Sequence, residues 1–253
     1  MDSVSLSPES GQPPPPDVLV LPEDVHLDGL EEHLRTAAVL SQHRGEHGAH
    51  PSYRVLLVGG VVVIAKPADE GGDGDRRVRH EVAAWLVARG LQLSHLVGAT
   101  VLREMPSQNT PDTETTYSLQ VVWPRQADNP SLTELIDDQV WEAAVFDAVI
   151  LTTDRSHNWI GASVGSPPGP PYHLALVDHG DAFGAARTPV SSAFYSAKQG
   201  QQIPPALLDK VGAYLASGGT ETLRKLVEAD RLMAMTSRLE HLLHSGTLTL
   251  PQP

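Results

Sequence analysis

The chain reads Thr153-Asp154-Arg155-Ser156-His157-Asn158-Trp159 in its second half and then, after a short interval, Leu176-Val177-Asp178-His179-Gly180-Asp181. The first stretch follows an apolar run at 141–151 whose spacing is typical of a helix, and the second ends a strand-like run at 174–177. Because glycine permits a sharp turn, the second stretch should present a carboxylate at the edge of a cleft. The two stretches therefore indicate a site built from acidic side chains on two turns.

The order of these acidic and amide residues is typical of a phosphotransfer site. In such sites an Asp orients a hydroxyl, and an Asn a few residues later and the Asp of a strand-ending Asp-x-Gly hold Mg²⁺ on ATP. Asp154 is the candidate for the hydroxyl, and Asn158 and Asp178 are the candidates for the metal ion, which prefers oxygen ligands. Asp181 is either a second metal ligand or a loop acid, and Arg155 either holds the loop or neutralises charge.

The composition limits the classes of function. The 253 residues are 40% hydrophobic, which is enough for one large core or two lobes that share a cleft. The net charge of −13 argues against nucleic acid or anionic lipid as the main partner, although there is one dense basic run, Arg76-Arg77-Val78-Arg79-His80. The absence of cysteine excludes disulfides and thiolate metal sites. Neither a secretory signal nor an apolar run of membrane-spanning length is visible, so we expect a cytoplasmic protein without membrane insertion; the oligomeric state stays unknown.

The distribution of apolar and turn residues predicts a Pro-rich tail at 1–18, a β-rich half at 19–122 and a helical half at 123–253. The β-rich half should contain a hairpin at 53–65 that turns at Gly59-Gly60 and delivers Lys66 at its end. Further strands are expected at 97–102 and 117–122, and helices at 27–40, 79–89, 141–151, 207–215 and 220–243. Ser131 and Glu134 form a possible capping box that opens another helix.

Several segments, taken together and in order, resemble the two-lobed protein-kinase-like fold, an α+β fold with a β-rich N-lobe and a helical C-lobe. The resemblance is greatest to an atypical branch that includes phosphatidylinositol 3-/4-kinases, HipA-type bacterial toxin kinases and small actinobacterial relatives. It spans about 53–184, extends to about 245 through the closing helix, and rests on Ile64-Ala65-Lys66-Pro67, Arg79-His80-Glu81, Val101-Leu102-Arg103, Ser118-Leu119-Gln120, Phe146-Asp147, Thr153-Asp154-Arg155 and Val177-Asp178-His179-Gly180.

The resemblance implies a role for residues of the β-rich half. Lys66 would bind the phosphates of ATP and be steadied by Glu81 on the following helix. The nucleotide would also contact Gln120 and Val122, near the crossover between the halves. The loop before the hairpin would cover the phosphates with backbone N–H groups, from candidates Gly45, Gly48 and Ser52. In the same loop His43, His47 and His50 have a spacing that would suit a metal site only on a helix, which the nearby glycines and Pro51 disfavour.

The sequence departs from the related kinases at one point. Asn158 follows Asp154 by four residues, whereas the relatives usually have five, and Ser156 stands between Arg155 and His157. Two hypotheses remain open. The first is an ATP- and Mg²⁺-dependent kinase that phosphorylates a hydroxyl, with a Ser or Thr of a peptide or protein favoured over an inositol lipid or a metabolite. The alternative is a catalytically impaired kinase-like protein that binds nucleotide or acts as a scaffold.

Overall fold

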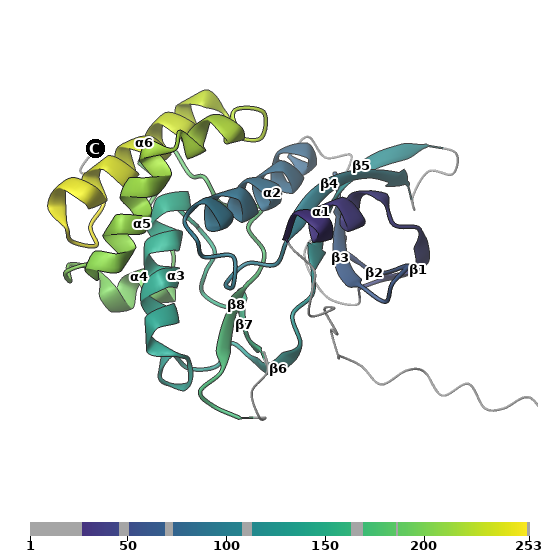
Figure 1. Ribbon diagram of the computed structural model, residues 1–253, viewed down its shortest axis with the longest axis horizontal. Helices are drawn as coiled ribbons and strands as arrows, with labels where there is room; N and C mark the ends of the chain where they lie inside the picture. Colours follow the sequence, from purple (N-terminus) through teal and green to yellow (C-terminus); the bar gives the residue numbers. More distant parts are fainter. Residues whose placement is uncertain are drawn as a thin grey trace, which may run out of the picture.

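The computed structural model of the chain describes residues 27–45, 51–68, 73–107, 113–162, 169–185 and 187–251. The expected Pro-rich tail and Gly48 lie outside these residues. Figure 1 shows a β-rich half with α1 on one side, a helical half with α3 to α6 on the other, and α2 between them. No helix in the described ranges combines the length and the apolar character needed to cross a membrane.

The β-rich half is built on a five-stranded antiparallel sheet in the order β1-β2-β3-β5-β4. Its strands are β1 Val39–Arg44, β2 Tyr53–Leu57, β3 Val62–Pro67, β4 Thr100–Pro106 and β5 Glu114–Val121. β2 and β3 form the predicted hairpin, and Gly59 and Gly60 in its turn have φ of 90° and 83°, a conformation that favours glycine. The side chains of β2 alternate between buried and more exposed, as expected for a sheet with one face on a core.

The helix expected at 27–40 is shorter than predicted. The helix α1 spans Leu27–Thr36 and buries Leu30 and Leu34, and the chain then forms the edge strand β1. The predicted stripe of Leu27, Leu30, Leu34 and Ala38 led the range to Leu40, but Val39 and Leu40 are exposed on β1, at 39% and 60%. Periodicity therefore extended the helix too far, because these two apolar residues do not face the core.

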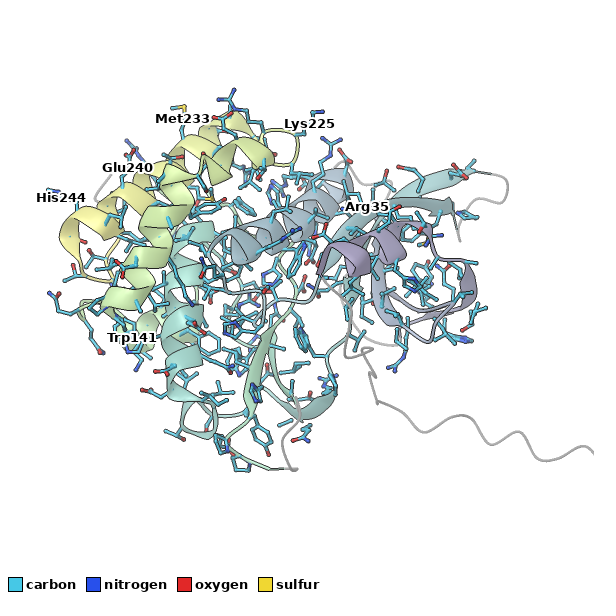
Figure 2. The ribbon with its side chains drawn as sticks, in the orientation of Figure 1. Arg35, Trp141, Lys225, Met233, Glu240 and His244 are labelled. Carbon is cyan, nitrogen blue, oxygen red and sulfur yellow. The ribbon has the colours of Figure 1, made fainter. Side chains whose placement is uncertain are left out.

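The helical half contains the 3₁₀ turn η1 Leu132–Glu134 and the helices α3 Asp137–Ile150, α4 Ala193–Lys198, α5 Pro205–Ala216 and α6 Ala229–Ser245. Its small antiparallel sheet has the order β6-β7-β8, from Arg125–Asp128, Trp159–Ala162 and His173–Leu176. The capping box at Ser131 is present, but it caps only η1. On the outer side of α6, Figure 2 shows Met233, Glu240 and His244 pointing away from the helical half.

The long helix expected at 220–243 is also interrupted. The structure has a 3₁₀ turn η2 at Gly219–Leu223 and then α6 from Ala229, with Glu228 in an extended conformation between them. Leu223 and Val227 are both buried, so the chain turns inward across the break. Apolar spacing continues through 224–228, which is why periodicity alone did not reveal the interruption.

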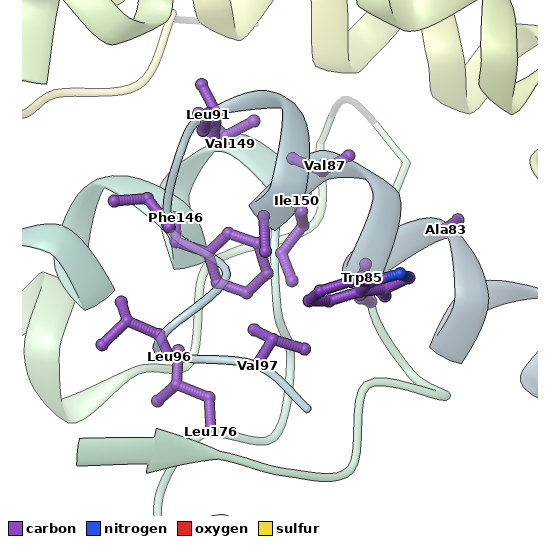
Figure 3. Close-up of a cluster of buried hydrophobic side chains, with 14 of the residues drawn as sticks. Ala83, Trp85, Val87, Leu91, Leu96, Val97, Phe146, Val149, Ile150 and Leu176 are labelled. Atoms are coloured by element: carbon purple, nitrogen blue, oxygen red, sulfur yellow. The ribbon is translucent and has the colours of Figure 1, made fainter. Parts of the chain in front are cut away.

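One large hydrophobic core runs through both halves, and a small second cluster in the β6-β7-β8 sheet contains Ile160, Ala162 and Ala175. The helix α2 Gly74–Gly90 contributes Ala83, Trp85 and Val87, and α3 contributes Phe146, Val149 and Ile150. Figure 3 shows these side chains packed with Leu91, Leu96 and Val97 of the segment after α2 and with Leu176 of β8. The shared core packs α2 against α3 of the helical half. The division into 19–122 and 123–253 stays a prediction.

Candidate active site

Lys66 joins three parts of the fold. It lies near the end of β3, and its Nζ forms an ion pair with Glu81 Oε1 of α2 and lies 2.7 Å from Asp178 Oδ1, in the turn after β8. Burial by itself would lower the pKa of Lys66, but the carboxylates of Glu81 and Asp178 outweigh burial and raise the pKa above its ordinary value. Lys66 is therefore a fixed positive charge at the junction of the two halves.

Glu81 holds the turn after β8 as well as Lys66. Its second carboxylate oxygen, Oε2, accepts a hydrogen bond of 3.0 Å from the backbone N–H of His179. Glu81 is only 2% exposed, because α2 packs between the sheet of the β-rich half and α3. A buried carboxylate is tolerated where it is paired and hydrogen-bonded, and Glu81 has both kinds of partner.

Asp178 has an unusual backbone conformation. Its φ is 58°, in the left-handed region that few residues other than glycine adopt. Two residues later, a Cβ at Gly180 would lie 3.2 Å from Cβ and Nε of Arg77, so glycine lets the turn approach α2 closely. Burial raises the pKa of Asp178, but Lys66 and Arg77 have the larger combined effect and hold the pKa below its ordinary value. The side chain is 41% exposed, so an ionised carboxylate lies at the surface beside Lys66.

Internal hydrogen bonds join the two ends of the shortened loop at 154–158. Asn158 Nδ2 donates hydrogen bonds to the backbone oxygen of Asp154 at 2.8 Å and to Asp154 Oδ2 at 3.2 Å. Asp154 is exposed, and Asn158 is half-buried. The shortened loop thus keeps the two side chains together, with the amide nitrogen of Asn158 engaged by Asp154.

The side chain of Arg155 is fully buried and contacts both acidic turns. Its Nη1 donates to the backbone oxygens of Asn158, at 2.5 Å, and Val177, and its Nη2 lies 2.8 Å from His179 Nδ1. Its Nε lies 3.3 Å from Asp147 Oδ1. A side chain with no exposed surface does not contact a substrate, so Arg155 positions the two turns relative to each other. The sequence left open whether Arg155 holds the loop or neutralises charge, and the geometry agrees with the first of these roles.

Asp147 and His179 complete this buried network. Asp147 Oδ2 accepts a 2.7 Å hydrogen bond from Ser192 Oγ, and burial raises the pKa of Asp147 even though Arg155 and Ser192 act in the opposite direction. Burial, with the charges of Arg155 and Lys66, lowers the pKa of His179 well below its ordinary value, so the ring is neutral. Because Arg155 can only donate, His179 Nδ1 accepts, and its Nε2–H donates to Leu176 O at 3.3 Å.

The other candidate residues are more dispersed. Asp181 pairs with Arg77 at 3.1 Å, and Gln120 on β5 donates to Thr100 Oγ1 at 3.3 Å. Val122 donates its N–H to Val62 O at 3.2 Å, at the start of the connection between the halves. In the loop before the hairpin, the Gly45 N–H is already bonded to Ser52 O at 2.8 Å.

Sequence reasoning missed three contributors to the site. Asp147 anchors Arg155, and its signal was an acid flanked on both sides by apolar residues of α3. Arg77 and His80 contact the turn after β8, through Asp181 and through Gly180 O at 3.2 Å. The basic run in the sequence was the signal for these two, but α2 begins at Gly74 rather than at 79, which places the run in its first two turns.

The donors at this site suit a small hard cation. In the described part of the chain no three His, Asp or Glu side chains gather as a metal cluster. The sequence-predicted ligands Asp178, Asp181 and Asn158 carry side-chain oxygens, which is the ligand type that Mg²⁺ prefers. Mg²⁺ usually binds through one or two carboxylates together with ligand phosphates, not in a cage made only of protein atoms.

The comparisons with known proteins identify the fold. No family model and no curated protein matches the sequence. Among solved structures, the Golgi casein kinase with Mn and ADP bound superposes with a TM-score of 0.61 at 14% identity, covering 88% of this chain and 75% of that one. Hydra Fam20 with sugar gives a TM-score of 0.62 at 13% identity, covering 91% of each chain. These likenesses show that the chain has a two-lobed, α+β protein-kinase-like fold.

Proposed function

We propose that this protein is an ATP- and Mg²⁺-dependent phosphotransferase that phosphorylates a hydroxyl group. The observation that carries the proposal is the contact of Lys66 with both Glu81 and Asp178, at the junction of the two halves. A scaffold would have no need to collect a lysine and two acids from three separate elements. The neighbour of the same fold that has Mn and ADP bound supports the use of a nucleotide and a divalent cation.

Each residue has a role that follows from its position. Lys66 would hold phosphate oxygens of ATP as a point charge, and Glu81 would fix its direction. Asp178, Asn158 and Asp181 would hold the cation, which supplies positive charge to the phosphates during transfer. We further propose that the nucleotide extends past Gln120 and Val122, on the side of the connection between the halves, and that the loop with Gly45, Gly48 and Ser52 covers its phosphates; the engaged N–H of Gly45 is not a donor there.

Asp154 is the proposed base. It is exposed and its Oδ2 is held by Asn158, so the carboxylate is oriented and accessible to an acceptor. The acceptor oxygen bonds to the γ-phosphorus of ATP while its proton passes to Asp154. The bond between the γ-phosphorus and the bridging oxygen breaks, and ADP leaves with that oxygen. In this scheme catalysis depends on positioning and charge neutralisation.

We propose a Ser or Thr of a peptide or protein as the acceptor. The net charge of −13 disfavours approach to an anionic membrane surface, which argues against an inositol lipid. We also propose that the protein is a relative of phosphatidylinositol 3-/4-kinases and HipA-type kinases, and that it is a bacterial protein located in the cytoplasm.

Calorimetry of ATP binding tests the metal site. Asp178→Asn keeps the side chain's shape and removes its charge, so Mg²⁺-dependent ATP affinity should fall at least about tenfold, a typical cost of disturbing a metal site. Asp209→Asn, which removes an exposed carboxylate on α5, is the matched control and should bind like the parent. Unchanged melting temperatures would show that both variants fold. Parental Mg²⁺-dependent affinity in Asp178→Asn would refute the assignment.

The alternative, a nucleotide-binding protein without phosphotransfer, is favoured by one observation. In the shortened loop the side-chain amide of Asn158, a proposed ligand of the cation, already donates hydrogen bonds to Asp154. The two functions differ in turnover. The kinase should release phosphate slowly from Mg·ATP even without its acceptor, and Asp154→Ala should abolish this release. Tight Mg·ATP binding with no release and no transfer to any tested hydroxyl would favour the alternative.

A further inference from the structure

A pocket lies beside the turn after β8, and its lining includes Asp181 but not Lys66. It has a volume of about 250 Å³. Its walls come from the start of α2, from residues 180–182, 184–185 and 188, and from α6. Its polar lining is Arg76, His80, Thr153, Asp181, Thr188 and Arg231. The phosphotransfer proposal uses Asp181 of this lining but assigns no role to its two arginines, one of which, Arg76, belongs to the basic run on α2.

The lining of the pocket is positively charged. Arg76 comes from α2 and Arg231 from α6, whereas Asp181 is the only acid in the lining, and Arg77 pairs with it at 3.1 Å. The Nε atom of Arg76 is buried and has no hydrogen-bond partner within the described residues. Arg76 also lies in the first turn of a long helix, where the backbone dipole favours an anion. A buried donor without a partner is costly, and an oxygen ligand would satisfy it.

The acids that pair with these arginines outside the lining are easily displaced. Asp73, which is 72% exposed, lies 3.3 Å from Arg76 Nη2. Glu228, which is 46% exposed, lies 3.4 Å from both Arg231 Nε and His80 Nε2. Exposed ion pairs at such distances contribute little to stability. A ligand with two negative charges and several acceptor oxygens would therefore compete successfully for the same guanidinium groups.

We propose that this pocket binds a phosphate group, held between Arg76 and Arg231, at a site separate from Lys66. The pocket is smaller than those that take drug-sized ligands, and it suits a tetrahedral oxyanion with a few waters. The planar fork of arginine donors matches phosphate oxygens in pairs. A bound phosphate group would link α2 to α6. This inference does not depend on phosphotransfer activity.

Calorimetric titration of the full chain with inorganic phosphate, without nucleotide or Mg²⁺, tests the site. Arg231→Gln and Arg76→Gln should each weaken binding about 10- to 100-fold, the loss expected for one charge-assisted contact. Arg224→Gln is the matched control, because Arg224 also sits three residues from its glutamate but is 70% exposed. Arg224→Gln should bind phosphate like the parent, and Lys66→Gln tells whether the phosphate binds beside Lys66 instead.

Two results would overturn the proposal. One is parental phosphate affinity in both Arg76→Gln and Arg231→Gln. The other is a loss in Lys66→Gln as large as in these variants, which would place the phosphate at Lys66 instead. Arg231 Nη1 also donates to Phe183 O at 2.8 Å, so Arg231→Gln could disturb the fold. If thermal melting shows that it does, the phosphate affinity of Arg76→Gln alone decides the test. A parallel titration with O-phosphoserine identifies the source: tighter binding than phosphate favours a phosphorylated side chain, and weaker binding favours the free ion.

Discussion

Replacing Arg155 by methionine tests whether this arginine holds the two motifs together. The substitution keeps much of the volume of the side chain but removes all of its donors. Asp147 would lose its charged partner while remaining fully buried. The backbone oxygens of Asn158 and Val177 would each lose the hydrogen bond from Arg155, and Asn158 O would keep only that from the Val177 N–H. We expect Arg155→Met to lower the free energy of unfolding.

The magnitude follows from the burial of the pair. Both side chains are 0% exposed, and breaking such a pair by removing one partner costs about 3–5 kcal/mol, because an uncompensated charge stays buried. Each 1.4 kcal/mol is a factor of ten, so the folding equilibrium should shift by roughly 10²- to 10³-fold or more. Against a typical total stability of 5–15 kcal/mol, this is a large fraction, but a folded variant should remain at low temperature.

Urea unfolding followed by tryptophan fluorescence measures the loss. The midpoint should move while the slope with denaturant stays the same, since the surface exposed on unfolding hardly changes. The control is Arg79→Met, which breaks an exposed helical pair with Asp75 and should alter stability by less than about 0.5 kcal/mol. Combining Arg155→Met with Asp147→Asn should cost less than the sum of the single changes, because no buried charge is then left alone.

A loss for Arg155→Met no larger than that of the Arg79→Met control would refute the reasoning. If phosphotransfer then failed while stability was unchanged, Arg155 would have to act on the reaction directly, against its burial.

Three further predictions concern chemistry, pH and packing. Asp154→Ala should slow phosphate transfer about 10²- to 10⁴-fold and leave ATP affinity unchanged, and transfer within about threefold of the parent would exclude Asp154 as the base. Burial lowers the pKa of His179 well below 6.5, so on acidification the unfolded chain takes up this proton before the folded chain does. The free energy of unfolding should therefore fall as pH drops below 6.5, by up to about 1.4 kcal/mol per pH unit. Urea unfolding should show a shallower dependence of that free energy on pH in His179→Gln but not in the control His157→Gln, which alters an exposed ring. Gly98→Ala would put a Cβ 2.5 Å from the Val121 oxygen, and thermal unfolding should show a loss of about 1–3 kcal/mol, whereas no loss would mean that this backbone shifts freely.

The sequence predicted the elements whose signals are local and strong. The β2–β3 hairpin was visible because its glycine pair separates two β-branched runs, and α2, α3 and α5 were visible in their apolar spacing. The acids on the two turns were visible because phosphotransfer chemistry needs those residue types in that order. Their meeting with Lys66 followed from the family resemblance, and the structure brings Lys66, Glu81 and Asp178 together as expected.

The elements that the sequence did not reveal have weak or misleading patterns. The strand β6 is mostly polar, with Ala127 as its one apolar residue, and β1 is an edge strand with mostly exposed side chains, so neither shows the alternation of a half-buried strand. The break between η2 and α6 lies within continuous apolar spacing, where tertiary burial of Leu223 and Val227 decides the path of the chain. The partnership of Asp147 with Arg155 depends on three-dimensional packing, which no spacing rule contains.

The position of α2 has a consequence for how the chain opens. Its side chains pack into the core of both halves, and Glu81 and His80 bond the turn after β8. The amide hydrogens in the middle of α2 should therefore exchange with solvent only when β5 and α3 also exchange, in one cooperative opening. A fragment that ended in the connection after Val122 would expose the face of α2 that Phe146, Val149 and Ile150 cover, so it should aggregate unless the remainder of the chain is supplied to reassociate with it.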